Sequence, residues 1–293
     1  MKVAIYGQYQ TKEAIGYIKI LMAILADKNI TAVFEANFYA LIKEQAFPTT
    51  TYPTFASYQE LDESFEVMLT VGGDGTFLRA VTFVRDRDIP ILGINIGRLG
   101  FLATVQKEHI EKAINLLISK KYVIDERSLL TVSTSSSNEL AGLNFALNEI
   151  AVSRKNTTSM ITIETYLNNE YLTSYWADGL IIATPTGSTG YSLSCGGPIL
   201  APDTQSLVIT PIAPHNLNAR PLVIADSTEL TLKIIAREKE ALLSLDSRTV
   251  SIDSTVTIHV KKSDFKIKTI LLHENTFFKT LREKLLWGED KRN

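Results

Sequence analysis

A turn built around three glycines, Val71-Gly72-Gly73-Asp74-Gly75-Thr76, restricts most strongly what this chain can fold into. Glycine leaves no Cβ in the way of a ligand, but ordering it costs more conformational entropy than ordering any other residue. The apolar run 67–71 predicts a buried strand before the turn, and the run 76–81 predicts the opening of a helix after it. Such turns at the carboxyl edge of an α/β sheet bind phosphates through free backbone N–H groups and the positive end of the helix dipole. We therefore expect a bound ligand here, close to the Asp74 carboxylate.

The composition is that of an ordinary globular chain and narrows the functional classes. The 293 residues are enough for two domains, each with its own core. The net charge is -2 and no long block of one sign occurs, which argues against a nucleic-acid partner. Cys195 is the only cysteine, which favours a reducing compartment, and the histidines lack the spacing of a structural zinc site. With no signal-peptide pattern and no run of about 18 apolar residues, we expect a cytoplasmic protein without a membrane partner.

The apolar pattern divides the chain into two halves with different periods. Residues 1–122 alternate strand-like and helical runs, which predicts an α/β domain with a mainly parallel sheet covered on both faces. Residues 123–274 follow a period of two, which predicts an all-β, sandwich-like domain. The segment 275–293 returns to helical spacing, and we expect its helix to pack back on the N-terminal domain. The expected strands are 2–6, 31–34, 66–71, 91–94, 129–135, 144–153, 161–167, 171–183, 207–211, 229–235, 241–245, 255–260 and 266–272, and the expected helices are 13–25, 76–85, 107–119 and 276–287.

Three polar features could carry chemistry, and each has a structural alternative. The segment 184–191 is rich in glycine and hydroxyl side chains, as a phosphate or ribose cradle is, but an ordinary tight loop has the same composition. Asn148-Glu149 interrupts an apolar strand, so at least one of the two faces the interior or a cleft unless the strand ends there in solvent. Asp74 precedes a glycine, which is a favoured turn pair, but its place between a strand and a helix argues against a plain hairpin.

Four motifs in the same order resemble the NAD kinase family along nearly the whole chain. They are Gly72-Gly73-Asp74-Gly75-Thr76, Gly93-Ile94-Asn95 with Leu99-Gly100-Phe101, Asn148-Glu149, and Asp178-Gly179 leading into Thr184-Pro185-Thr186-Gly187-Ser188-Thr189. Pro214-His215 and Arg220-Pro221-Leu222 also resemble the family's pattern. The first motif alone is weak, because diacylglycerol and sphingosine kinases carry close relatives of it. The resemblance implies transfer of a phosphoryl group from ATP, or from polyphosphate, to the 2′-hydroxyl of the adenosine ribose of NAD, which gives NADP.

The resemblance also implies a role for each residue that matches a family motif. Asp74 would be the general base at the 2′-hydroxyl, a role that contributes about 10² to 10⁴-fold in rate. Mg²⁺ would be held mainly by substrate phosphates. Asn148 and Glu149 would contact the ribose hydroxyls and adenine of NAD, and Asp178 would contact the nicotinamide carboxamide. The other nucleotide-binding residues would be Gly72, Gly73, Gly75, Thr76, Phe101, Thr186, Ser188, Thr189, Gly190, Tyr191, Ser194 and Asp246.

The sequence departs from the family's pattern at three places. Gly190 stands where many members have alanine, Trp176 stands where many have a basic residue, and Asp246-Ser247-Arg248 replaces the usual Asp-Gly-Gln. The resemblance also implies a homodimer or homotetramer in which adjacent subunits contribute to the NAD site. Two other classes are open at this point. One is a lipid kinase of the diacylglycerol or sphingosine type, and the other is a non-catalytic dinucleotide sensor, against which the presence of Asp74 argues.

Overall fold

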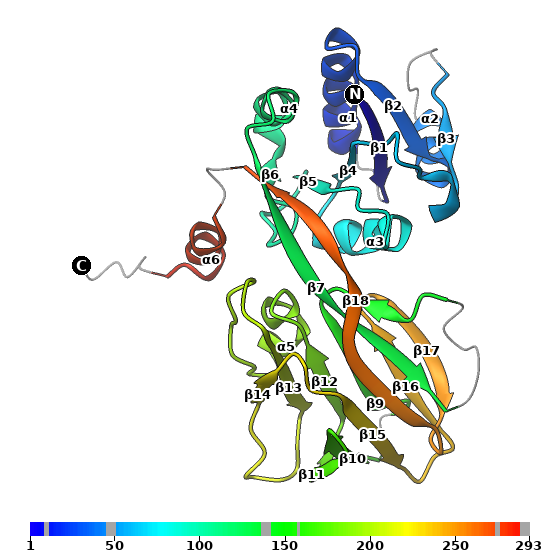
Figure 1. Ribbon diagram of the computed structural model, residues 1–293, viewed down its shortest axis with the longest axis vertical. Coiled ribbons are helices and arrows are strands. Elements are labelled where there is room, and N and C mark those ends of the chain that lie inside the picture. The colour runs from blue at the N-terminus through cyan, green and yellow to red at the C-terminus, as the bar shows by residue number, and fades with distance from the viewer. Residues whose placement is uncertain (9–11, 45–50, 136–141, 157–158, 273–275, 288–293) are drawn as a thin grey trace. The chain divides into compact units, whose positions relative to one another are not determined.

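The computed structural model describes residues 1–8, 12–44, 51–135, 142–156, 159–272 and 276–287, and the chain falls into two compact units. The first unit comprises Met1–Glu126 and Ile267–Asn293, and the second comprises Arg127–Lys266. The predicted boundary at residue 274 differs from the observed one because a single long strand, β18 (Thr257–Leu271), replaces the two strands expected there (Figure 1). Its first ten residues belong to the second unit and the remainder to the first.

The first unit contains a parallel sheet, as the alternating pattern predicts. Its order is β3-β2-β1-β4-β5, with β6 and Thr269 of β18 paired beside β5, and all of these pairings are parallel. Every residue of β4 and of β5 is buried, so both faces of the central strands are covered. The strands are β1 (Lys2–Gly7), β2 (Thr31–Glu35), β3 (Thr54–Phe55), β4 (Val67–Val71), β5 (Ile91–Asn95) and β6 (Val105–Gln106).

Helices cover this sheet and supply its core. Helices α1 and α4 contact each other and bury apolar residues such as Ile18 and Ile114 against the alternate strand residues Ile5 and Leu69. Helix α3 contacts β1, β4 and β5. The ring of Phe277 in α6 lies 6.2 Å from that of Phe101, and α6 belongs to the first unit. The helices are α1 (Lys12–Asp27), α2 (Ala36–Lys43), α3 (Asp74–Val84), α4 (Ile110–Ile118) and α6 (Phe277–Leu285), with single 3-10 turns η1 (Tyr58–Glu60) and η2 (Lys107–His109).

The second unit contains two antiparallel layers, which confirms the sandwich-like prediction. One sheet has the order β14-β13-β12-β9-β16-β17, and the other contains β11, β10, β15 and β18 with β7 and β8 (Figure 1). Residues of both sheets, including Val152, Leu180, Ile163 and Leu232, share one buried core. The strands are β7 (Val123–Thr134), β8 (Phe145–Ala146), β9 (Glu149–Arg154), β10 (Ile161–Leu167), β11 (Glu170–Ala177), β12 (Gly179–Ala183), β13 (Ser206–Ile212), β14 (Leu222–Ala225), β15 (Leu230–Ile235), β16 (Glu240–Leu245) and β17 (Arg248–Asp253).

The strand predicted over 171–183 is in fact two strands in different sheets. Strand β11 ends at Ala177 and β12 begins at Gly179, with Asp178 between them. The backbone of Asp178 already belongs to the second sheet, because its N–H donates to the Ile212 carbonyl and its carbonyl accepts from the Arg154 N–H, both at 3.0 Å. The chain therefore changes layers at Asp178, and the sequence does not reveal the break because apolar residues continue on both sides of it.

Candidate functional site

The sheet of the first unit has a change of strand order at β1, which has β2 on one side and β4 on the other. In open α/β sheets, ligands bind outside the carboxyl ends of the strands at such a switch point. The residues that leave β4 at this edge are Gly72 and Gly73, and α3 follows them directly. The N–H groups of the first turn of a helix have no intrahelical partners, so the start of α3 offers donors and a positive dipole end here.

The fold does not require the three glycines of the turn equally. Helix α3 begins at Asp74, two residues before the predicted opening, because the Gly73 carbonyl accepts from the N–H groups of Thr76 and Phe77 at 3.0 and 3.2 Å. Gly72 has φ 155°, and a methyl group there would collide with the buried Thr76 side chain. A methyl group at Gly73 or Gly75 would meet no atom within 4 Å. These last two glycines therefore leave room that the fold itself does not require.

The carboxylate of Asp74 is fixed by the loop that follows β5. Its Oδ2 accepts the Phe101 N–H at 2.8 Å, and its Oδ1 accepts the N–H groups of Leu102 and Ala103, both at 3.0 Å. A methyl group at Gly100 would collide with this carboxylate, so the loop can close on Asp74 only with glycine there. A carboxylate has about four acceptor positions on its two oxygens, so Oδ2 keeps one for a ligand.

The side chain of Phe101 contacts the C-terminal helix. Its ring packs against Phe277, and the Lys284 ammonium lies 5.0 Å from its centroid. The backbone of Phe101 thus orients Asp74 while its ring holds α6 in the same unit. This places Phe101 together with Asp74 and the glycine turn, whereas the other predicted site residues lie in the second unit.

In the second unit, the backbone of residues 147–149 is hydrogen-bonded on both sides. The three N–H groups donate to the Asp246 carboxylate at 2.9, 2.7 and 3.2 Å. The Leu147 carbonyl accepts from the Thr184 hydroxyl at 2.6 Å, and the next carbonyl accepts from the Thr184 N–H at 2.9 Å. The Glu149 carbonyl accepts from the Asp246 N–H at 3.0 Å. All six backbone groups are therefore satisfied, and the peptide is held in one orientation.

The side chains on this peptide carry acceptor oxygens that the described part of the chain does not satisfy. Asn148 Oδ1 and Glu149 Oε2 are buried and have no hydrogen-bond partner there. A buried unsatisfied polar atom costs about 1–3 kcal/mol, so both oxygens favour a ligand that brings donors. A methyl group at Gly190 would lie 3.1 Å from Glu149 Oε2 and 3.4 Å from Asn148 Nδ2, so glycine keeps the space beside them open.

Burial also changes the protonation of Glu149. Desolvation, and then the negative charge of Asp246, raises the pKa of Glu149 to about 8, while the Tyr191 N–H acts in the opposite direction. Burial likewise raises the pKa of Asp246 above its ordinary value, against the effect of the three N–H donors and of Arg248. Glu149 is therefore mainly neutral at pH 7 in the ligand-free chain.

The glycine- and hydroxyl-rich segment is a tight loop against Asn148. It forms the short helical turns η3 (Gly187–Thr189) and α5 (Tyr191–Ser194), and a methyl group at Gly187 would collide with the Asn148 backbone. The buried Ser188 hydroxyl donates to the Pro185 carbonyl at 2.6 Å and accepts the Leu200 N–H at 2.9 Å. The Thr189 hydroxyl donates to the carbonyl of Thr186, whose own hydroxyl accepts from Arg127. Several predicted cradle hydroxyls thus hold the loop itself, whereas Tyr191 and Ser194 are exposed.

Asp178 lies away from the Asn148-Glu149 pair within the second unit. Glu149 pairs with Ala183 at one end of β12, whereas Ser153 pairs with Gly179 at the other. Four residue steps of about 3.3 Å separate these ends by roughly 13 Å. The Asp178 carboxylate there forms an ion pair with Arg154 at 3.0 Å.

Three residues have roles in this arrangement that sequence reasoning did not assign. Gly100 leaves space for the Asp74 carboxylate. Thr184 donates to two carbonyls of the peptide 147–149, and Arg248 donates to the carbonyls of Leu143 and Phe145. Gly100 and Thr184 do occur inside the recognised motifs, and Arg248 is one of the departures from the family's pattern. The motifs therefore gave the positions, but only the fold shows the contacts.

The described residues contain no group of three or more His, Cys, Asp and Glu side chains that could hold a metal ion. None of the helices within the described ranges is both long and apolar enough to cross a membrane.

The fold and the site define a class of two-domain proteins that join an α/β unit with a phosphate-binding type of glycine turn to a β-sandwich. Residues 3–122 match the family model described as the ATP-NAD kinase N-terminal domain, and residues 147–272 match the ATP-NAD kinase C-terminal domain. The chain therefore belongs to the NAD kinase family, as its motifs predict.

Curated relatives match over the full length of the chain. The NAD kinase of Flavobacterium psychrophilum is 60% identical over 294 residues, and that of Cytophaga hutchinsonii is 44% identical, each with 100% of both chains covered. The crystal structure of an NAD kinase from Archaeoglobus fulgidus in complex with ATP has a TM-score of 0.75 and 26% identity, covering 98% of this chain and 99% of that one. Yeast NADH kinase complexed with NADH has a TM-score of 0.88 at 24% identity, covering 99% and 88%, and shows the same fold.

Proposed function

We propose that this protein transfers the terminal phosphoryl group of ATP, or of polyphosphate, to the 2′-hydroxyl of the adenosine ribose of NAD. Family membership supports the reaction, and one observation supports the acceptor. The peptide 147–149 has every backbone group satisfied, yet it holds two buried acceptor oxygens without donors. Vicinal ribose hydroxyls supply such donors, whereas an acyl glycerol brings long apolar chains, so the lipid kinase alternative is not favoured.

In this proposal Asp74 is the general base. The three N–H groups of the 101–103 loop fix the carboxylate, and Oδ2 keeps an acceptor position for the hydroxyl proton. The donor phosphates would lie at the start of α3, over Gly73 and Gly75, because positioning and charge neutralisation dominate phosphoryl transfer. Asp74 would thus receive a proton at one end of the site, while the turn holds the phosphates.

We also propose that Mg²⁺ arrives with the donor. Mg²⁺ keeps several water ligands and is usually bound through substrate phosphates, so it does not require an all-protein cage. The described residues contain no group of three or more His, Cys, Asp and Glu side chains that could form such a cage. Bound Mg²⁺ would neutralise phosphate charge, and removing it with a chelator is expected to stop the reaction.

The proposed assembly is a homodimer or homotetramer in the cytoplasm. Family membership supports an assembly in which adjacent subunits contribute to the NAD site. Large exposed side chains on the second unit, Trp176 and Leu217, are 45% and 90% exposed and fit a surface buried between copies. Light scattering of the purified protein tests the assembly, and a monomer at micromolar concentration would contradict it.

The reaction itself is tested with a panel of acceptors and donors. Purified protein is incubated with Mg²⁺, each of NAD, NADH and diacylglycerol as acceptor, and each of ATP and polyphosphate as donor, and the products are detected directly. We expect NADP from NAD, and loss of product when a chelator removes the metal. A protein that phosphorylated the lipid and left NAD unchanged, or that made no NADP at any enzyme level, would overturn the proposal.

A Gly75→Ala substitution is expected to weaken use of ATP without weakening the fold. Gly75 lies in the first turn of α3 with open space beside it, so alanine adds about 0.5–1 kcal/mol of helix stability and no internal clash. The methyl group would occupy the proposed phosphate position, and we expect kcat/KM for ATP to fall about tenfold or more. Gly16→Ala is the matched control, because Gly16 is also an exposed helical glycine with no atom near its Cβ position. Equal kcat/KM values for the two variants would contradict the placement of the phosphates.

A further inference from the structure

The turn between β16 and β17 is hydrogen-bonded to the segment 143–149, which carries Asn148 and Glu149. Arg248 donates to the Leu143 carbonyl at 2.7 Å and to the Phe145 carbonyl, and its guanidinium lies 5.2 Å from the centroid of the Phe145 ring. Two residues earlier, the Asp246 carboxylate accepts the N–H groups of residues 147–149. One turn therefore binds carbonyls in the first part of the segment 143–149 and N–H groups in the second part.

The geometry of the turn explains why Asp246 and Arg248 suit these hydrogen bonds better than other residue types would. Asp246 has φ 51°, in the left-handed region, where aspartate is tolerated better than most side chains. Its Oδ1 takes two of the three N–H groups and its Oδ2 takes the third, so both oxygens are used. A guanidinium is planar and can donate to two carbonyls at once, which a lysine ammonium matches less well.

We propose that Asp246 and Arg248 act as positioning residues that set the affinity for NAD through Asn148 and Glu149. This inference rests on the proposed function, because the oxygens held in place are the acceptors for the ribose hydroxyls. Arg248 fixes the start of the segment and Asp246 fixes its end, so the two unpartnered oxygens are oriented before the nucleotide arrives. Pre-orientation lowers the entropy that binding must otherwise remove.

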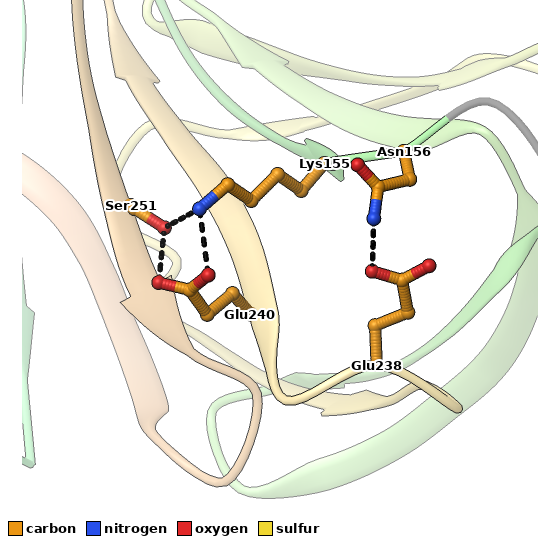
Figure 2. A network of polar contacts seen from close by, with 5 residues as sticks. All are labelled: Lys155, Asn156, Glu238, Glu240 and Ser251. Carbon is orange, nitrogen blue, oxygen red and sulfur yellow. Dashed lines mark hydrogen bonds and ion pairs between the residues drawn. The ribbon is translucent and has the colours of Figure 1, made fainter.

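The opposite end of the same hairpin supplies an internal comparison. There Lys155 and Ser251 both contact the Glu240 carboxylate, and Asn156 donates to Glu238 (Figure 2). These contacts tie the hairpin to the chain just beyond β9, whose Arg154 pairs with Ala241, whereas Glu149 stands at the other end of that strand. They are exposed, so each contributes little to stability. A substitution there loosens the same hairpin without touching the peptide 147–149.

The test compares Arg248→Ala and Arg248→Lys with Lys155→Ala. Two quantities are measured in each: the hydrogen-exchange rates of the amides of residues 147–149, and the KM values for NAD and for ATP. For Arg248→Ala we expect faster exchange and a KM for NAD raised about tenfold or more, with kcat and the KM for ATP within about twofold of the parent. Arg248→Lys keeps one donor and the charge and is expected to fall between. Lys155→Ala is expected to match the parent in both quantities.

The outcomes separate this inference from the proposed function. Unchanged amide exchange in both Arg248 variants would overturn the positioning role, whatever the enzymatic activity. A parent protein that made no NADP would overturn the proposed function, while faster exchange in Arg248→Ala would still support the structural part of the inference. A rise in the KM for ATP equal to that for NAD would also overturn it, because general loosening does not single out one substrate. If Arg248→Ala fails to fold, Arg248→Lys is compared with Lys155→Ala in the same two measurements.

Discussion

Replacing Asp74 with asparagine is expected to lower kcat for NADP formation by at least about 100-fold, since a positioned general base contributes about 10² to 10⁴-fold. The amide cannot take the hydroxyl proton. Its NH₂ group would also face one of the three N–H groups that Phe101, Leu102 and Ala103 now donate to the carboxylate. A donor left facing a donor costs about 1–3 kcal/mol, so some loss of stability is expected as well. Steady-state kinetics with NAD and ATP varied separately, and a thermal melt of each protein, measure the two effects.

The kinetic pattern distinguishes a base from a loop anchor. Loss of the base lowers kcat while the affinities for NAD and ATP change little, whereas a displaced loop raises KM. Asp62→Asn is the matched control, because Asp62 is an exposed aspartate of the same unit that accepts the Ser64 N–H at 3.0 Å. That variant is expected to keep the parental kcat. An Asp74→Asn protein with kcat within about tenfold of the parent would contradict the assignment of Asp74 as the base.

The sequence alone locates much of this site because its signals are local. An apolar run, a glycine turn and a helical run are neighbours in the chain, so the position of Asp74 at the carboxyl end of β4 follows from periodicity and turn chemistry. Asn148-Glu149 stands out because two adjacent polar residues interrupt an apolar stretch. Both segments lie where the fold needs polar groups, at the carboxyl end of β4 and at the start of β9. In each case the local pattern and the tertiary arrangement agree.

Other features depend on contacts between distant residues or lack a local signal. Asp246 and Leu147 are 99 positions apart, and Arg248 and Leu143 are 105 apart. No local pattern therefore reveals that the β16–β17 turn is hydrogen-bonded to the segment 143–149. Helix α2 was not predicted because its N-cap is Glu35 and not one of the usual short capping residues. The Glu35 carboxylate accepts two N–H groups at the start of the helix.

The free energy of unfolding of the ligand-free protein is expected to fall as the pH rises from about 5 to about 9, and Glu149→Gln is expected to remove most of that fall. The pKa of Glu149 is about 8 in the folded chain against an ordinary value of 4.5, so between these values the folded state binds the extra proton. Stability from this group is therefore complete below about pH 4.5 and is lost as the pH rises through about 8. The expected amplitude is on the order of a few kcal/mol, and urea unfolding at a series of pH values measures it.

NAD binding should follow the opposite trend, because ribose hydroxyls donate to an ionised carboxylate better than to a protonated one. We therefore expect NAD affinity to increase toward pH 8 and binding below pH 8 to release a proton, which calorimetry detects in buffers of different ionisation enthalpy.

Glu240→Gln is the control, because Lys155 and Ser251 lower the pKa of Glu240 and it does not titrate in this range. The charge of Asp246 faces Glu149 in both the parent and the control, so the comparison isolates Glu149. Stability that stayed level from about pH 5 to about pH 9 in the parent would show that Glu149 is already ionised and would remove the expected coupling between proton release and NAD binding.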